Sequence, residues 1–203
     1  MAELERKPPL IAIVGPTAVG KTALSLDLAE RFGCEIISGD SMQVYRRMDI
    51  GTAKLPPDER RGIPHHLIDI REPHEPFSVA EFQKLCAERI RDIASRGRLP
   101  MLVGGTGLYV EAVCYGFPLG EAEGADPEFR RRMRALAETE GPEALHARLK
   151  EVDPETADRL HPRDVKRVIR ALEVYETTGR PMSEVQAQRR GEPKTSPYNL
   201  LII

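Results

Sequence analysis

Residues 15–22 form a glycine-rich segment that fixes the kind of fold this chain can adopt. The segment reads Gly15-Pro16-Thr17-Ala18-Val19-Gly20-Lys21-Thr22, which is the P-loop pattern G-x-x-x-x-G-K-[ST]. In such a loop the glycines let backbone N–H groups face phosphate oxygens, the lysine adds a positive charge, and the threonine hydroxyl can ligate Mg²⁺. An apolar run at 9–14 precedes the loop, and a helical pattern follows it. The segment therefore predicts an anion site at a helix N-terminus, and it leaves open whether the phosphates belong to a nucleotide.

Strand and helix patterns alternate up to about residue 115. Short apolar runs at 34–37, 67–70 and 99–103 predict strands. Residues 78–81 have the pattern of a capping box, in which the serine hydroxyl and the glutamate carboxylate each accept a backbone N–H, and they predict a helix that ends near residue 97. The alternation predicts an α/β fold, a P-loop NTPase-like parallel sheet with helices on both faces.

Two further loops follow predicted strands and carry candidate site residues. In a parallel sheet such loops meet at the carboxyl edge, so Asp40 and Thr106 are expected near the P-loop. The Asp40 carboxylate could hold Mg²⁺ through water, accept a proton, or only cap an Asx-turn. Thr106 lies among three glycines, which suggests either close approach of a ligand or a tight turn.

The composition changes near residue 116, where strand patterns stop. Asp-Pro, Gly-Pro and His-Pro pairs separate short amphipathic patterns, which predict a small all-helical insertion at 116–190, rich in arginine. Residues 191–203 return to the core as a buried strand, so that the core takes up 1–115 and 191–203. A parallel strand at the end of the sequence, with no helix after it, leads us to expect a piece of a longer protein whose C-terminal part is missing.

The bulk properties exclude several classes of protein. The net charge of −2 over 203 residues gives no global field for nucleic acid, so any such contact must be local. The three cysteines show no disulfide or metal-ligand spacing, and the adjacent His65 and His66 would point to opposite faces of a strand. Because the sequence has no signal-peptide pattern and no apolar run of membrane-spanning length, we expect a cytoplasmic protein with no membrane partner. We also expect it to be a monomer.

The ordered set of motifs resembles the bacterial tRNA dimethylallyltransferases. The set comprises the P-loop, Ser38-Gly39-Asp40-Ser41-Met42-Gln43-Val44-Tyr45, Met48-Asp49-Ile50-Gly51-Thr52-Ala53-Lys54, Pro64-His65-His66-Leu67-Ile68-Asp69, Gly104-Gly105-Thr106-Gly107-Leu108-Tyr109 and Lys166-Arg167-Val168-Ile169-Arg170-Ala171-Leu172-Glu173. The resemblance covers nearly the whole chain. It implies transfer of a dimethylallyl group from dimethylallyl diphosphate to N6 of the adenosine on the 3′ side of the anticodon, in tRNAs that read UNN codons.

The resemblance also implies a role for each matching residue. Asp40, Lys21 and Thr17 would be catalytic, and Gly15, Pro16, Thr17, Ala18, Val19, Gly20, Lys21 and Thr22 would bind the diphosphate or a nucleotide. Thr22 would lie next to Mg²⁺, the one implied cofactor. The residues that would contact the anticodon loop of tRNA are Asp40, Ser41, Met42, Gln43, Thr106, Lys166, Arg167 and Arg170.

Three other functions remain open. A small-molecule kinase could use the same loop, and an adenylate prenyltransferase would prenylate a free nucleotide instead of tRNA. A third possibility is a fragment that binds tRNA without chemistry. Because the family continues beyond the equivalent of residue 203, we expect this chain to be poorly active or inactive and to expose apolar surface.

Overall fold

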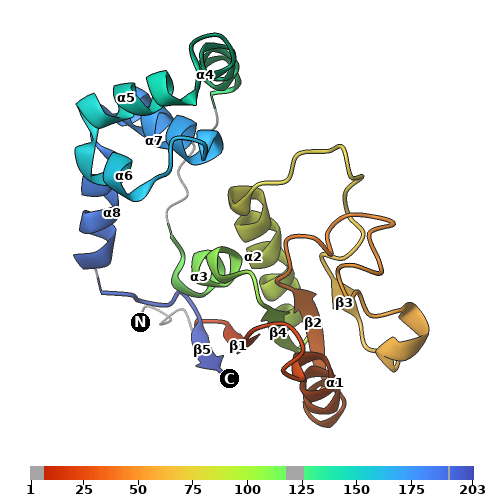
Figure 1. Cartoon of the computed structure of the whole chain (residues 1–203). Coiled ribbons are helices and arrows are strands. Elements are labelled where there is room, and N and C mark those ends of the chain that lie inside the picture. The colour runs from red at the N-terminus through yellow and green to blue at the C-terminus, as the bar shows by residue number, and fades with distance from the viewer. Residues whose placement is uncertain (1–6, 118–125, 192) are drawn as a thin grey trace. The chain divides into compact units, whose positions relative to one another are not determined.

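The structure is a computed structural model that describes residues 7–117, 126–191 and 193–203 (Figure 1). Its contacts divide the chain into a core unit, Met1–Leu119 with Lys194–Ile203, and a helical unit, Gly120–Pro193. The core unit contains β1 (Pro9–Val14), α1 (Lys21–Phe32), β2 (Cys34–Ser38), a short 3₁₀ turn (Pro57–Arg60), β3 (His65–His66), α2 (Val79–Ser95), β4 (Leu99–Gly104), α3 (Gly107–Tyr115) and β5 (Asn199–Ile202). The helical unit contains α4 (Pro127–Glu140), α5 (Pro142–Val152), α6 (Pro154–Arg159), α7 (Val165–Thr178) and α8 (Met182–Gly191).

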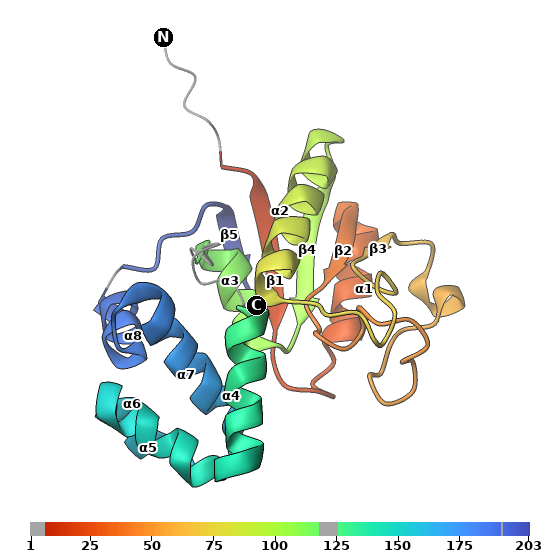
Figure 2. The same ribbon diagram turned by 90° about the horizontal axis from the view of Figure 1, so that it is seen from above.

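The core unit is built on one parallel sheet with the strand order β3-β2-β4-β1-β5, which Figure 2 shows from above. Successive side chains of a strand point to opposite faces, so each strand contributes to two cores. One face packs against α1 and the other against α2 and α3, so that the strands lie between these helices in Figure 1. The first core includes Ile13, Ile36, Met101 and Leu26, and the second includes Ala12, Ile37, Leu102, Phe82 and Ile90. The predicted fold class is confirmed.

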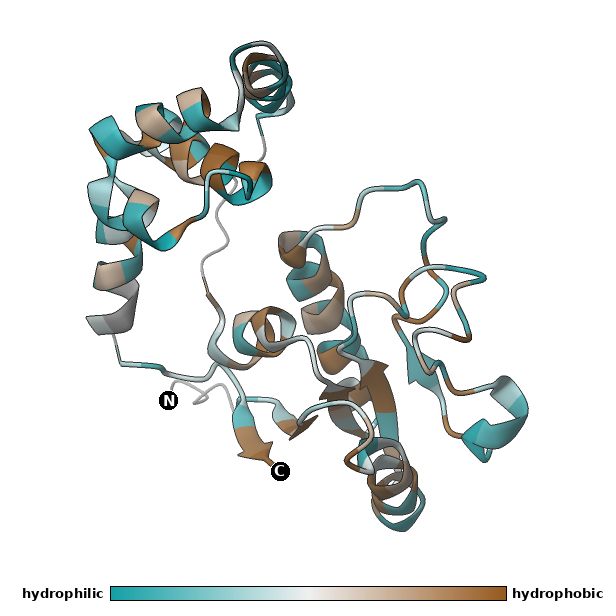
Figure 3. Ribbon diagram, in the orientation of Figure 1, coloured by the Kyte–Doolittle hydropathy of each residue, from teal (hydrophilic) through white to brown (hydrophobic). Residues whose placement is uncertain are grey.

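Burial on both faces explains why these strands consist of nearly continuous apolar runs. Figure 3 shows the apolar colouring on the central strands, while the surrounding helices carry both apolar and hydrophilic colouring. The helix ends follow the sequence signals as well. Gly33 ends α1 in the left-handed region at φ 65°, and the hydroxyl of Ser78 accepts from the backbone N–H of Glu81 at the start of α2.

Two local predictions in the core unit are wrong. Residues 67–70 do not form a strand, because Leu67 and Asp69 have φ values of 59° and 57°, which break an extended backbone; the paired residues are His65 and His66 instead. The capping box is only half formed. The Glu81 carboxylate binds the Arg71 guanidinium rather than the backbone of Ser78, because an arginine is available ten positions earlier in the chain.

The last strand, β5, pairs with β1 in the expected parallel direction but is not buried. Asn199 and Leu200 lie beside Pro9 and Leu10, and the Ile203 carbonyl accepts from the Val14 N–H. Leu201 and Ile202 are nevertheless 56% and 43% exposed. The prediction of a buried strand is therefore wrong, and the expected exposure of apolar side chains is found here.

The helical unit has a core of its own, formed by the inward faces of α4, α5 and α7. Asp126, Asp153 and Asp164 cap α4, α6 and α7 through backbone N–H groups, as their positions before these helices suggest. None of the helices in the described part of the chain combines the length and apolar character that a bilayer crossing needs.

A buried ion cluster lies at the amino end of β2 in the core unit. Both carboxylate oxygens of Glu35 accept from the Arg96 guanidinium, and Oε2 also lies 2.8 Å from Nε2 of His66. The hydrogen bonds of Arg96, followed by those of His66, lower the pKa of Glu35 from 4.5 to about 2 despite its burial. The cluster joins the sheet to the end of α2 and gives His66 a structural partner.

We predict that Glu35→Gln destabilises the protein in a pH-dependent way. The depressed pKa means that ionised Glu35 stabilises the folded state above pH 4.5, and that this contribution falls as the pH drops toward about 2. Urea unfolding should show a loss of about 2 kcal/mol at pH 7, shrinking steadily below pH 4.5.

The matched control is Asp92→Asn, which removes an exposed partner of the same arginine. It should cost no more than about 0.5 kcal/mol. A Glu35→Gln variant whose deficit is the same at pH 3 and pH 7 would contradict the assigned ion cluster.

Candidate active site

Three loops meet at the carboxyl edge of the sheet, after β1, β2 and β4. The Gly39 N–H donates to the Val103 carbonyl over 2.8 Å, and the Ser41 N–H donates to Oγ1 of Thr106 over 3.1 Å. A Cβ placed on Gly105 would lie 3.0 Å from the Gly15 carbonyl oxygen. The Thr106 loop thus lies against both the Asp40 loop and the P-loop.

The P-loop presents backbone donors to solvent. Gly20 occupies the N-cap position of α1 at φ 92°, and no described side chain caps this helix. Its first N–H groups therefore suit an anion. The Lys21 ammonium donates to the carbonyls of Gly15 and Pro16, at 2.9 Å and 2.6 Å. The lysine is held over the loop, close to where phosphate oxygens would bind.

Asp40 lies in a turn directly after β2. Its Oδ1 accepts from the backbone N–H groups of Met42 at 2.7 Å and Gln43 at 3.3 Å, which makes the Asx-turn that the sequence left as an alternative. Among the described residues these bonds use Oδ1 alone. The turn therefore fixes the carboxyl group and leaves its second oxygen for chemistry, so the structural and the chemical interpretations are compatible.

The side chains near Asp40 differ in their hydrogen bonds and in their exposure. Gln43 is held on both sides, because its Oε1 accepts from the Ser38 hydroxyl and its Nε2 donates to the Thr52 carbonyl, at 2.9 Å and 3.1 Å. Met42 is 43% exposed. Thr106 uses its hydroxyl to hold Ser41 rather than to cap α3. Contacts of Ser41, Met42, Gln43 and Thr106 with tRNA stay predictions.

Lys54 is a residue of this region whose role sequence reasoning missed. Its buried ammonium donates to the Tyr45 carbonyl at 2.8 Å and to carboxylate oxygens of Asp49 and Asp69 at 2.8 Å and 2.7 Å. Desolvation opposes the charge, but the hydrogen bonds of Asp49 and Asp69 outweigh it and raise the pKa of Lys54. The cluster fastens residues 45–54, which follow the Asp40 turn. No sequence pattern links a lysine to aspartates five and fifteen positions away, so this role could not be predicted from the sequence.

The predicted basic residues belong to the helical unit. Lys166 and Arg167 are exposed on α7, and Arg167 pairs with Asp164 at 3.3 Å. Arg170 donates to Oε2 of Glu173 over 2.7 Å, and the Glu173 side chain is fully buried. Arg130 binds the same carboxylate, which also accepts from the Asp126 N–H. Arg170 therefore has a structural bond in addition to the predicted contact with tRNA.

Comparison with known proteins decides the family. The family model described as IPP transferase matches residues 43–203. The chain belongs to this family. It is 57% identical over 194 residues to a tRNA dimethylallyltransferase of Geobacillus thermodenitrificans, covering 96% of this chain and 60% of that protein. For the enzyme of that name in Symbiobacterium thermophilum the identity is 61% over 188 residues, with coverages of 93% and 59%.

Solved structures of the family agree. A full-length tRNA isopentenylpyrophosphate transferase from Bacillus halodurans matches with a TM-score of 0.60 and 52% identity, covering 96% of this chain and 59% of that one. A eukaryotic dimethylallyltransferase acting on tRNA matches with a TM-score of 0.77 and 34% identity, covering 96% and 47%. The resemblance drawn from the motifs is confirmed. The chain spans about 60% of the length of the curated relatives named here.

We predict that Gly104→Ala disrupts this edge of the sheet. A Cβ at position 104 would lie 2.5 Å from both the carbonyl carbon and oxygen of Gly39, and 2.7 Å from its Cα, so the backbones must separate. Urea unfolding should show a loss of about 1–3 kcal/mol, typical of forced overpacking.

Gly107→Ala is the control, since nothing lies within 4 Å of its added Cβ. That variant should unfold within about 0.5 kcal/mol of the parent protein. If both variants behaved alike, the close approach of the two loops would be refuted.

Proposed function

We propose that the protein transfers a dimethylallyl group from dimethylallyl diphosphate to N6 of the adenosine 3′-adjacent to the anticodon, in tRNAs that read UNN codons. The observation that supports this most is that an anion-binding loop and a loop that bears a fixed carboxylate lie at the same edge of the sheet, each against the Thr106 loop. Membership of the IPP transferase family, whose relatives are named for this reaction, narrows the chemistry. With tRNA as its substrate, the protein would work in the cytoplasm.

The P-loop residues would bind the diphosphate. Backbone N–H groups of residues 15–22 and the Lys21 ammonium would neutralise its oxygens, and Thr17 would add a hydroxyl. Lys21 needs only to exchange its carbonyl partners in the loop for phosphate oxygens. Thr22, exposed on the first turn of α1, suits Mg²⁺ because hydroxyl and phosphate oxygens are hard ligands, and the ion would supply further charge neutralisation.

Asp40 would act as the general base. The N6 lone pair forms a bond to the allylic carbon, the carbon–oxygen bond to the diphosphate breaks, and its electron pair leaves with the diphosphate. The proton lost from N6 passes to the Asp40 carboxylate. The Asx-turn supports this role, because it holds the carboxyl group in one orientation. The acceptor base has to leave the anticodon-loop stack to reach such a group.

The P-loop by itself also suits a nucleotide, so the donor is the first point to test. We predict that calorimetry shows binding of dimethylallyl diphosphate in the presence of Mg²⁺, and that Lys21→Ala weakens it roughly 10- to 100-fold by removing a charge-assisted hydrogen bond. Lys84→Ala, on the exposed side of α2, is the control and should bind as the parent does. Tight binding of ATP with no response to the prenyl diphosphate would favour a kinase.

We predict that Asp40→Asn abolishes transfer without loosening the loop. The amide oxygen can accept the same two backbone bonds, while the base is lost, so the rate should fall by about 10²- to 10⁴-fold. Single-turnover assays with protein in excess over tRNA measure even slow transfer. Asp58→Asn, in the exposed 3₁₀ turn, is the matched control.

Three experimental outcomes would favour a different function or mechanism. Transfer to AMP but not to tRNA would favour an adenylate prenyltransferase. Undiminished transfer by Asp40→Asn would remove this residue from the mechanism. If the parent chain binds tRNA tightly but transfers nothing to it, the non-catalytic alternative describes this chain better.

A further inference from the structure

The helical unit contains a pocket that no role described above explains. It has a volume of about 250 Å³ and is formed by side chains of α6, α7 and α8 and of the residue that follows α6. Three arginines, a glutamine and two apolar residues provide most of its lining: Arg159, Arg167, Arg170, Gln186, Leu160 and Met182. Arg159, Gln186, Leu160 and Met182 are not among the residues that the sequence motifs assign to tRNA.

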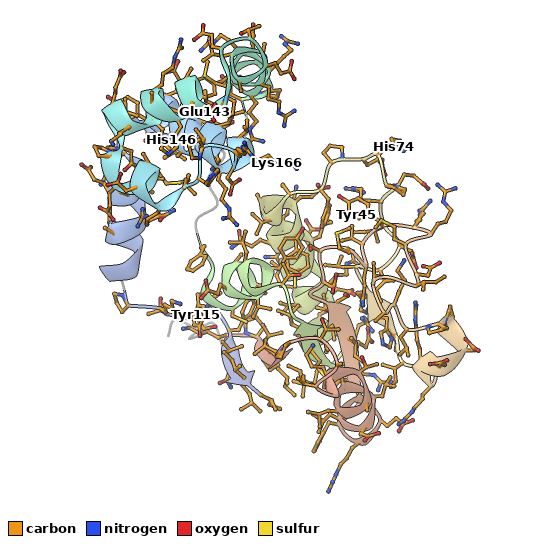
Figure 4. All side chains as sticks on the ribbon, in the orientation of Figure 1. Tyr45, His74, Tyr115, Glu143, His146 and Lys166 are labelled. Carbon is orange, nitrogen blue, oxygen red and sulfur yellow. The ribbon has the colours of Figure 1, made fainter. Side chains whose placement is uncertain are left out.

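The pocket is supported by hydrogen bonds that fix its walls. The buried carboxylate of Asp153 accepts from the N–H of Thr156 through Oδ1 and from that of Ser183 through Oδ2, both at 3.0 Å, and so ties the start of α6 to the start of α8. His146 on α5 (labelled in Figure 4) lies with Nε2 2.9 Å and 3.0 Å from the carbonyls of Ala157 and Leu160. Both ends of α6 are thereby held in place.

Carboxylates orient the arginines of the pocket. Arg159 donates to Glu155 and to the hydroxyl of Thr156, both over 3.1 Å. Arg170 is held by the fully buried Glu173, and Arg167 by Asp164. A guanidinium has five N–H donors, and these bonds use one or two of them in each case. Among the residues that the structure describes, the remaining donors have no other partner, so they and the flat guanidinium faces can meet a ligand.

The lining indicates a ligand with a flat apolar part and an anionic part. Leu160 and Met182 offer apolar contact, Gln186 offers an amide that can both donate and accept, and the arginines suit a phosphate. The volume lies below the range of about 300–1,000 Å³ that is typical of sites for drug-sized ligands. One nucleotide combines these properties: a base with polar edges, flat faces and a phosphate.

We propose that this pocket receives one unstacked nucleotide of the RNA substrate, other than the adenosine that reacts. Its lining belongs to the helical unit, whereas the P-loop and Asp40 belong to the core unit. Proteins that read single-stranded RNA splay bases out and stack them on side chains, including arginine planes. Lys166 and Arg167, exposed on the same α7 helix, fit the adjoining backbone. This inference rests on the proposed function, because it takes tRNA as the substrate.

The test uses fluorescence anisotropy with the full chain and anticodon-loop hairpins that carry an abasic site at each loop position in turn. Besides the parent, the proteins are the pocket variants Arg159→Gln and Gln186→Ala and the controls Arg148→Gln and Gln188→Ala. Arg148 pairs with Glu140 outside the pocket, and Gln188, two residues after Gln186 on α8, accepts a hydrogen bond from Arg180. Each control removes the same group as its pocket variant.

For the parent, one abasic position besides the reacting adenosine should weaken binding roughly 5- to 100-fold. In both pocket variants, the loss of affinity caused by that abasic position should be no more than about twofold, while in the control variants it should be as large as in the parent. The penalty at the reacting adenosine should not change in any variant. This pattern identifies a base that the pocket holds, because a backbone contact would weaken all hairpins equally.

Two results would overturn this inference but not the proposed function. One is a loss of affinity at the abasic position that is equal in pocket and control variants, and the other is uniform weakening of the binding of every hairpin by Arg159→Gln. Binding of free AMP or CMP that matches hairpin binding and is lost in the pocket variants would assign the pocket to a free nucleotide instead. If no hairpin binds the parent protein at all, the proposed function itself fails, and the inference fails with it.

Discussion

The close approach of two backbones at the carboxyl edge of the sheet determines the candidate active site. Gly104 lies against Gly39 so tightly that no Cβ fits between them. Because β2 and β4 are neighbours in a parallel sheet, this contact sets how the following loops meet. Asp40 and Thr106 are the next polar residues on the two loops, and the Ser41 N–H joins them through the Thr106 hydroxyl. The P-loop, which follows the adjacent strand β1, completes the edge, and a Cβ on Gly105 would lie 3.0 Å from its Gly15 carbonyl oxygen.

Buried charges hold the segments that sheet and helix packing leave free. Lys54 fastens the stretch after the Asp40 turn, Glu173 joins α7 to the start of α4, and Asp153 joins α6 to α8. Each has several partners, as the cost of removing a charge from water requires. A buried ion pair contributes little net stability compared with apolar packing. The main effect of these three residues is therefore to fix geometry rather than to add stability. Each of them holds an irregular segment or a helix end next to candidate binding residues.

The sequence was informative where the signal is local and less so where the partner is distant. The P-loop, the Asp-Pro pairs that separate helices and the alternation of strands with helices all depend on residues a few positions apart, and the structure has each of them. The failures concern long-range choices. Glu81 found Arg71 rather than its own helix, the apolar run at 67–70 contributes Leu67 to the core without forming a strand, and β5 is exposed although it reads as a core strand. A partner in space diverted Glu81, left-handed backbone at Leu67 and Asp69 broke the strand, and the exposure of β5 depends on what packs on it; none of these follows from residue spacing.

The two units differ in how they present positive charge, which bears on how a chain of net charge −2 would bind the proposed RNA substrate. In the core unit, Lys21 is bound by neutral carbonyls, so its full charge faces the P-loop. In the helical unit, each pocket arginine binds a carboxylate, although Arg170 shares Glu173 with Arg130; these bonds reduce the field and hold the guanidinium groups in place. Long-range attraction, which depends on uncompensated charge, would then be weak. Recognition by the helical unit would depend on shape and on directed hydrogen bonds, which suits a partner whose splayed bases must be told apart at short range.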